Sequence, residues 1–199
     1  MMKIVRLPAP YFLTGKYKKW GKRFKERREA NPNALFSWTQ LNGRRINKIL
    51  LDDLMTMTEK HCSFCDGFPI ETVSSKTIEH FRPKSQFPHL AYVWINLFYC
   101  CSKCQESKQE DFDKKLLKPD VDNYSFDYYF QYDTKTGEII PNPDRENDEI
   151  ERAKITIKLY GWNNHNRPTA RKRTIRMYND SNNSVLNDFP YRFILNYLS

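Results

Sequence analysis

Two Cys-x-x-Cys pairs, separated by 35 residues, are the feature that most constrains how this 199-residue chain folds. The pairs are Cys62 with Cys65 and Cys101 with Cys104. Each pair holds two thiolates on one tight loop, where both can reach the same tetrahedral ion, and two such loops complete a four-cysteine zinc site. Four protein ligands leave zinc no open position for water, so the predicted site is structural.

Disulfide pairing and redox chemistry are the alternatives to a zinc site. Residues 1–12 lack the apolar core of a signal peptide, and no apolar run approaches the length of about 20 residues that a membrane span requires. We therefore expect a cytoplasmic protein, whose thiols stay reduced. One Cys-x-x-Cys pair is compatible with redox catalysis, whereas two favour a metal. Cys100 is expected to pack as a small apolar residue, and His61, adjacent to Cys62, is a poor additional ligand.

Charge is distributed unevenly along the chain. The 33 Lys and Arg against 24 Asp and Glu give a formal net charge of +9. Residues 1–60 hold 14 basic and 5 acidic side chains, whereas residues 61–199 hold 19 of each, with a second basic segment at 167–176. An aromatic content of 15% excludes a disordered chain. The basic excess indicates a polyanionic partner without identifying it.

The densest basic run covers residues 16–28, which contain eight cations and one glutamate. Tyr17, Trp20 and Phe24 are spaced i, i+3 and i+7, so a helix places them on one stripe. The stripe is expected to pack on the core, or the cations to contact the phosphates of a nucleic acid. The two interpretations are compatible, because they use opposite faces of the same helix.

The remaining pattern predicts an α+β fold. Helices are expected over about residues 14–30, 37–60, 148–160, 167–178 and 185–198, and a hairpin over 128–140. Asp148 is expected to cap the third helix, and Gly161 to end it. The expected division is a basic helical extension (1–60), a zinc-stabilised core (61–119) and a hairpin with helices (120–199), together forming one compact unit.

Between the cysteine pairs lies a second motif, read in order as Glu79-His80, Pro83 and Asn96, with Lys108 following the last cysteine. Over about residues 61–108 this order and spacing resemble the zinc-bearing HNH endonucleases, also called ββα-metal nucleases. The resemblance implies a small ββα-metal core stapled by the four-cysteine zinc site, with helical extensions on both sides.

The resemblance also implies roles for individual residues. His80 would be the general base that activates water for attack on a phosphodiester, and Asn96 would orient its imidazole. Glu79 and Gln105 would bind one catalytic Mg²⁺ or Mn²⁺, because oxygen ligands suit hard cations. At the position of Gln105 the family usually has Asn or His, and the longer side chain is a departure from the pattern.

Three cations near the motif are candidate phosphate contacts, namely Arg82, Lys84 and Lys108. Their alternative is an ordinary solvated surface position. His89 and His165 are expected to be structural or exposed rather than catalytic.

Residues 77–84, 90–97 and 116–119 also resemble the PtuB-type HNH nucleases of Septu and retron-associated anti-phage defence. This resemblance implies a PtuA-like ATPase partner and, in a retron, a reverse transcriptase with its msDNA. The nucleic-acid substrate is left open between DNA and RNA. The alternatives are a zinc module that binds nucleic acid or protein without cutting, which the departure at Gln105 supports, and a structural adaptor of the ATPase.

Overall fold

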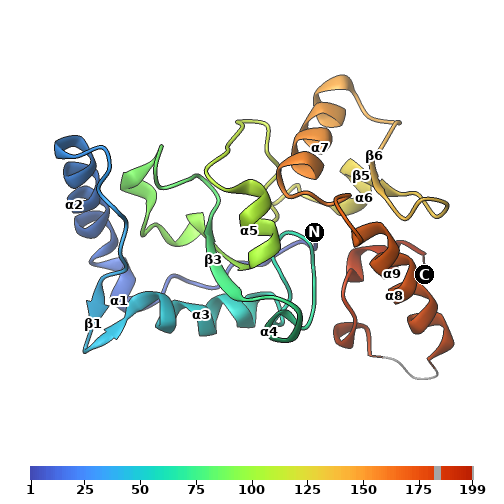
Figure 1. Ribbon diagram of the computed structural model, residues 1–199, viewed down its shortest axis with the longest axis horizontal. Helices are drawn as coiled ribbons and strands as arrows, with labels where there is room; N and C mark the ends of the chain where they lie inside the picture. The colour runs from blue at the N-terminus through green and yellow to red at the C-terminus, as the bar shows by residue number, and fades with distance from the viewer. Residues whose placement is uncertain (182–184, 199) are drawn as a thin grey trace.

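The computed structural model describes residues 1–181 and 185–198 as a mixture of helices and small sheets, the expected α+β class. Figure 1 places α2 (Tyr17–Ala30) at one end of the molecule and α8 (Arg167–Asp180) and α9 (Arg192–Leu198) at the other. Between them lie β3 (Lys76–His80) and α5 (Ser102–Lys108). None of the helices in the described part of the chain is long and apolar enough to cross a membrane.

A strand–strand–helix unit occupies the centre. β3 pairs antiparallel with β4 (Leu97–Cys101), so that Glu79 lies opposite Phe98 and His80 opposite Leu97. All five residues of β4 are buried. α5 begins at the residue after β4, and residues 81–96 form a long connection that contains two short 3-10 helices, Pro88–Leu90 and Trp94–Asn96. The motif residues therefore come from the end of β3, the 81–96 connection and α5.

The basic helix α2 packs its aromatic stripe inward. Trp20 and Phe24 are buried, while seven of its eight neighbouring cations are exposed. Gly21 makes this approach possible: a Cβ at this position would lie 2.5 Å from the carbonyl oxygen of His89. The packing interpretation of the stripe is confirmed, and His89 contributes through its backbone.

The expected helix over 37–60 is wrong in its first part. The structure has a two-stranded hairpin, β1 (Gln40–Leu41) and β2 (Arg44–Arg45), before α3 (Ile46–Met57) begins. Asn42 and Gly43 form the turn with φ of 49° and 77°. Asn-Gly is the preferred pair for such a turn, because both central residues adopt positive φ. This local signal overrides the apolar spacing that suggested a longer helix.

The C-terminal third follows the expected order. α6 (Phe126–Tyr129) leads into the hairpin of β5 (Phe130–Tyr132) and β6 (Ile139–Pro141), and α7 (Asn147–Leu159) and α8 follow. Two details differ. Asp148 lies inside α7 and pairs with Lys115 at 2.9 Å instead of capping the helix. The terminal helix starts at Arg192, after a 3-10 turn at Leu186–Asp188, because the segment before it contains Pro190.

The expected three-part division of the chain stays a prediction, and several contacts cross its boundaries. The amide of Ile4 donates to the carbonyl of Pro119 at 2.9 Å. The guanidinium of Arg6 lies 4.1 Å from the ring centroid of Phe98 and pairs with Asp120 at 2.7 Å. The first residues therefore pack directly on β4 in the central unit.

Candidate active site and metal centre

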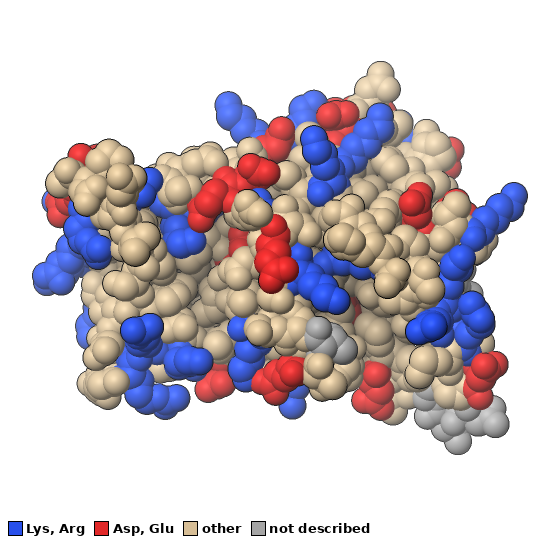
Figure 2. Space-filling view, viewed as in Figure 1, with Lys and Arg blue, Asp and Glu red and all other residues tan. Residues whose placement is uncertain are grey.

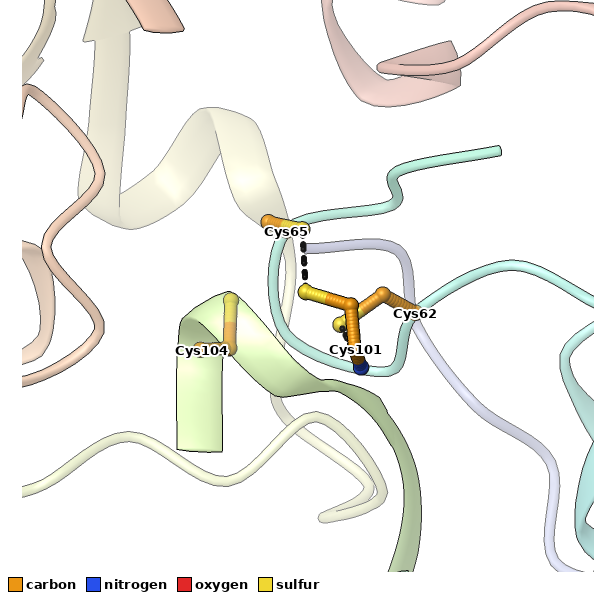
Figure 3. A group of neighbouring side chains, drawn as sticks. All are labelled: Cys62, Cys65, Cys101 and Cys104. Atoms are coloured by element: carbon orange, nitrogen blue, oxygen red, sulfur yellow. Dashed lines mark hydrogen bonds between the residues drawn. The ribbon is translucent and has the colours of Figure 1, made fainter. Parts of the chain in front are cut away.

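The two Cys-x-x-Cys pairs meet in space, as the sequence predicts. The sulfur atoms of Cys62, Cys65, Cys101 and Cys104 all lie within 4.8 Å of one another, and all four residues are buried. Figure 3 shows the sulfurs turned toward one another, with Cys62 and Cys65 on the loop after α3 and Cys104 on α5. The described residues contain no other such group of potential metal ligands.

The spacing of these sulfurs fits a tetrahedral zinc ion. A Zn–S bond of about 2.3 Å places neighbouring sulfurs about 3.8 Å apart, and Cys65 Sγ lies 3.7 Å from Cys101 Sγ. The amide of Cys101 donates to Cys62 Sγ at 3.4 Å, a contact that stabilises a thiolate. Four soft donors and complete burial suit a structural zinc, which would hold the start of α5 against the loop after α3.

The residues around the thiols have structural roles. His61 Nδ1 lies 2.8 Å from the carbonyl of Glu59 and Nε2 lies 3.1 Å from that of Phe189, so neither nitrogen is available as a ligand. Cys100 is fully buried on β4, as expected. Arg167 donates to Cys104 Sγ at 3.5 Å from the start of α8.

A pocket of about 380 Å³ gathers much of the second motif. It is lined by Glu79, His80, Pro83, Lys84, Gln105, Glu106, Gln109 and Glu110. Four of the predicted site residues thus share one cavity, although they are up to 26 positions apart in the chain (79 to 105). Figure 2 shows several acidic side chains gathered near α5 in the middle of the face drawn, with Lys and Arg side chains beside them and over the rest of that face.

His80 is buried and held through one ring nitrogen. Its Nε2 lies 2.9 Å from the carbonyl oxygen of Ala91, so Nε2 carries the hydrogen of a neutral ring and Nδ1 carries the lone pair. Burial lowers the pKa of His80 from 6.5 to about 3, and the nearby cation of Lys84 acts in the same direction. The imidazole is therefore neutral at pH 7, the state that a general base requires.

Glu79 forms an ion pair with Lys108. Lys108 Nζ lies 2.8 Å from Glu79 Oε1 and also donates to the carbonyl of His80 at 3.2 Å. Burial raises the pKa of the Glu79 carboxyl, and the ammonium of Lys108 opposes this shift. Lys108 is fully buried, so it is not the solvated surface residue of the alternative interpretation, and its ammonium neutralises Glu79 inside the protein. Its predicted contact with phosphate stays a prediction.

The side chain of Asn96 forms its hydrogen bonds with the backbone and not with the imidazole that it was expected to orient. Its amide nitrogen donates to the carbonyls of Arg82 and Leu90 at 3.0 and 3.2 Å, and its Oδ1 accepts from the amide of Arg82 at 2.8 Å. Asn96 therefore ties together the 81–96 connection. Its effect on His80 is indirect, because Leu90 precedes the residue whose carbonyl holds the ring.

The other predicted cations differ in their surroundings. Arg82 is exposed, with its guanidinium 5.6 Å from the ring of Phe87, and its phosphate contact stays a prediction. Lys84 is half-buried at the pocket and pairs with Glu110 at 3.1 Å. A phosphate at Lys84 would have to compete with this carboxylate.

The second basic segment is less of a surface patch than its sequence suggests. Arg171 is buried and donates to the carbonyls of Gly137 and Trp162, while Arg167 turns toward Cys104. Burial lowers the pKa of Arg171 to about 10. Of the five cations in 167–176, only Arg173 and Arg176 are exposed.

Comparison with known proteins gives a partial match. No family model matches the chain. The chain is 32% identical over 74 residues to the Septu protein PtuB of Bacillus thuringiensis. The matched segment covers 36% of this chain and 29% of PtuB, so less than a third of that protein is represented.

The aromatic residues that surround the His80 ring were not among the predicted site residues. Trp38 stacks on the imidazole with ring centroids 5.5 Å apart and an interplanar angle of 19°. Phe36 meets it edge-on at 5.4 Å, and Tyr92 contacts both of these aromatic rings. We call Phe36, Trp38 and Tyr92 the aromatic wall. Trp38 lies 42 positions before His80, outside the motif, and no spacing rule connects the two.

Proposed function

We propose that this chain is a metal-dependent HNH-type endonuclease that acts in anti-phage defence together with a PtuA-like ATPase. The observation that carries the proposal is the shared pocket of His80, Glu79 and Gln105 on a strand–strand–helix unit beside a four-cysteine site. The similarity to PtuB supports the defence role. The substrate is DNA or RNA, and a reverse transcriptase with msDNA joins the complex if the system is a retron.

The oxygen donors at the pocket fit a hard divalent cation that keeps most of its ligands as water or substrate oxygens. Glu79 and Gln105 both line the pocket, and Lys108 engages only one of the two carboxylate oxygens. Mg²⁺ is commonly held by one or two carboxylates together with substrate phosphates. When bound, Mg²⁺ or Mn²⁺ would supply positive charge to the phosphate during attack and departure.

The chain's own residues supply the proton transfer. His80 Nδ1 accepts a proton from water while the water oxygen forms a bond to phosphorus and the bond from phosphorus to the 3′ oxygen breaks. The burial that keeps His80 neutral also makes it a weak base. An anionic phosphodiester in the pocket raises the basicity of the ring, because a nearby negative charge favours the protonated form.

The test is cleavage by the assembled complex with Mg²⁺ or Mn²⁺. His80→Ala is expected to lose cleavage while keeping assembly, and His165→Ala is the matched control because His165 is exposed and distant in sequence from the pocket. Equal cleavage by wild type and His80→Ala would remove His80 from the mechanism.

A second candidate is a zinc module or ATPase adaptor that does not cut. The Glu79–Lys108 ion pair favours it, since the carboxylate already has a counter-charge. In this case Gln105→Asn gains no cleavage in a correctly assembled complex, and cells carrying His80→Ala keep full phage resistance.

The exposed cations of α2 have two candidate partners, the nucleic acid and an acidic surface of the ATPase. A charge-reversal variant distinguishes the two partners; it replaces with Glu the residues Lys18, Lys19, Lys22 and Arg23. Loss of assembly identifies docking, whereas loss of cleavage in an intact complex identifies substrate binding.

A further inference from the structure

The N-terminal segment reaches the pocket through the aromatic wall. Phe36 and Trp38 lie between α2 and the β1–β2 hairpin, far from the motif in sequence, and both rings contact His80. The hydroxyl of Tyr92 donates to the carbonyl of Ser37 at 2.9 Å. Tyr92 directly follows Ala91, whose carbonyl is the hydrogen-bond partner of His80. The bond to Ser37 therefore links the segment that carries Phe36 and Trp38 to the backbone that holds His80.

One hydrogen bond does not fix an imidazole. The contact between Nε2 and the Ala91 carbonyl holds one edge of the ring but does not by itself fix the plane of the ring. The nearly parallel indole of Trp38, inclined by only 19°, restrains the plane of the ring. Phe36, at an interplanar angle of 83°, closes a second side.

We infer that Trp38 is a positioning residue for His80, holding the plane of its imidazole so that the free nitrogen serves the pocket. Trp38 is not among the residues that line the pocket, and the motif residue that its ring contacts is His80, so its effect passes through His80. The catalytic consequence rests on the proposed nuclease function, whereas the restraint on the ring does not.

The wall is in turn supported by α2. Trp20 packs on Tyr92 with centroids 5.5 Å apart, and Phe24 packs on Phe36 at 5.1 Å. The buried stripe of the basic helix therefore supports the two rings that flank Trp38. Residues 20–38 are a part of the active site on this account, and not only an extension that carries charge.

The experiment compares Trp38→Leu, which keeps an apolar side chain without a ring, with Trp38→Phe, which keeps a ring. Leu35→Ala is the matched control, because Leu35 lies in the same segment and is 82% exposed. The first readout is the NMR shift of the His80 ring protons, assigned by their loss in His80→Gln. The second is kcat and KM for cleavage by the assembled complex.

Trp38→Leu is expected to remove the ring-current shift of His80 and to lower kcat by about 10²-fold with KM nearly unchanged, because small displacements of a catalytic group are costly. Trp38→Phe should restore most of both, and Leu35→Ala should change neither. An unchanged His80 shift in Trp38→Leu would overturn the inference, and so would an unchanged kcat in an active complex. A wild-type complex that does not cleave would refute the proposed function while the NMR shift still decides the positioning role. If Trp38→Leu does not fold, Trp38→Met, a second apolar side chain without a ring, takes its place, and the same two results decide the inference.

Discussion

The ammonium of Lys108 and the carboxylate of Glu79 form an ion pair inside the protein, with Nζ 2.8 Å from Oε1 and side-chain exposures of 0% and 5%. Desolvation of two buried charges offsets most of their attraction, so the pair adds little net stability. The pair matters because removal of either charge leaves the other buried without a counter-charge. The pair also joins α5 to the end of β3, the two elements that present Gln105 and His80 to the pocket.

Removal of the Lys108 charge should therefore destabilise the fold. Lys108→Met leaves Glu79 buried without a partner, and the free energy of unfolding is expected to fall by about 3–5 kcal/mol. Lys84→Met is the control: it breaks a pair with Glu110 whose side chains are 31% and 50% exposed, and should cost about 1 kcal/mol or less. If urea unfolding gave equal losses of unfolding free energy for Lys108→Met and Lys84→Met, the buried pair would contribute no more to stability than the exposed one. Adding Glu79→Gln to Lys108→Met should recover part of the stability.

One zinc ion per chain is expected by elemental analysis. Cys104→Ser removes a ligand and should yield protein without zinc that is largely unfolded, because the binding energy of a structural zinc contributes directly to folding. Cys100→Ser is the matched control, since Cys100 is equally buried but lies outside the cluster of four. Cys100→Ser should keep its zinc. A folded, metal-free Cys104→Ser protein would contradict the site.

Stability should fall on acidification through His80. Its folded-state pKa of about 3 lies below the ordinary value of 6.5, so between these values the unfolded chain binds more protons. The neutral His80 has its full stabilising effect above about pH 6.5. As the pH falls from there toward 3, the free energy of unfolding decreases by up to about 1.4 kcal/mol per pH unit.

His80→Gln should remove this component, whereas His165→Gln, which alters an exposed histidine, should keep it. Urea unfolding of the three proteins at about pH 7 and pH 5, with zinc present, measures the difference. Protonation of the cysteines affects all three alike. Identical pH dependence of wild type and His80→Gln would contradict the buried neutral imidazole.

Gly21→Ala should be harmful despite the helical preference for alanine. In an open helix this change stabilises by about 0.5–1 kcal/mol, but here the new Cβ would lie 2.5 Å from the His89 carbonyl. α2 would have to move away from the 81–96 connection, and we expect a lower Tm. Gly15→Ala is the control, since nothing lies within 4 Å of the corresponding Cβ. A Gly21→Ala protein at least as stable as Gly15→Ala would show that α2 is not held at this contact.

The features that the sequence predicted are those with local signals. Cys-x-x-Cys spacing fixes two ligands within one loop, and the Glu79-His80 pair lies on one strand, so both could be found without knowing the fold. The partners of Lys108 and Asn96 depend on how β3, α5 and the 81–96 connection meet, and adjacency rules say nothing about that. Asn42-Gly43 was a local signal that the apolar spacing of the next helix concealed.

Two arginines from the last third of the chain form hydrogen bonds at the four-cysteine site. Arg192 binds the buried Asp66, which follows Cys65, and Arg167 donates to Cys104. Docking of α8 and α9 therefore favours the arrangement of thiols that binds zinc. Zinc binding in turn favours docking of the helices, and by linkage the two effects are equal in free energy. A partner that binds the C-terminal helices and stabilises them in place would therefore raise the affinity for zinc without contacting the metal. A chelator that removes zinc would weaken the binding of that partner.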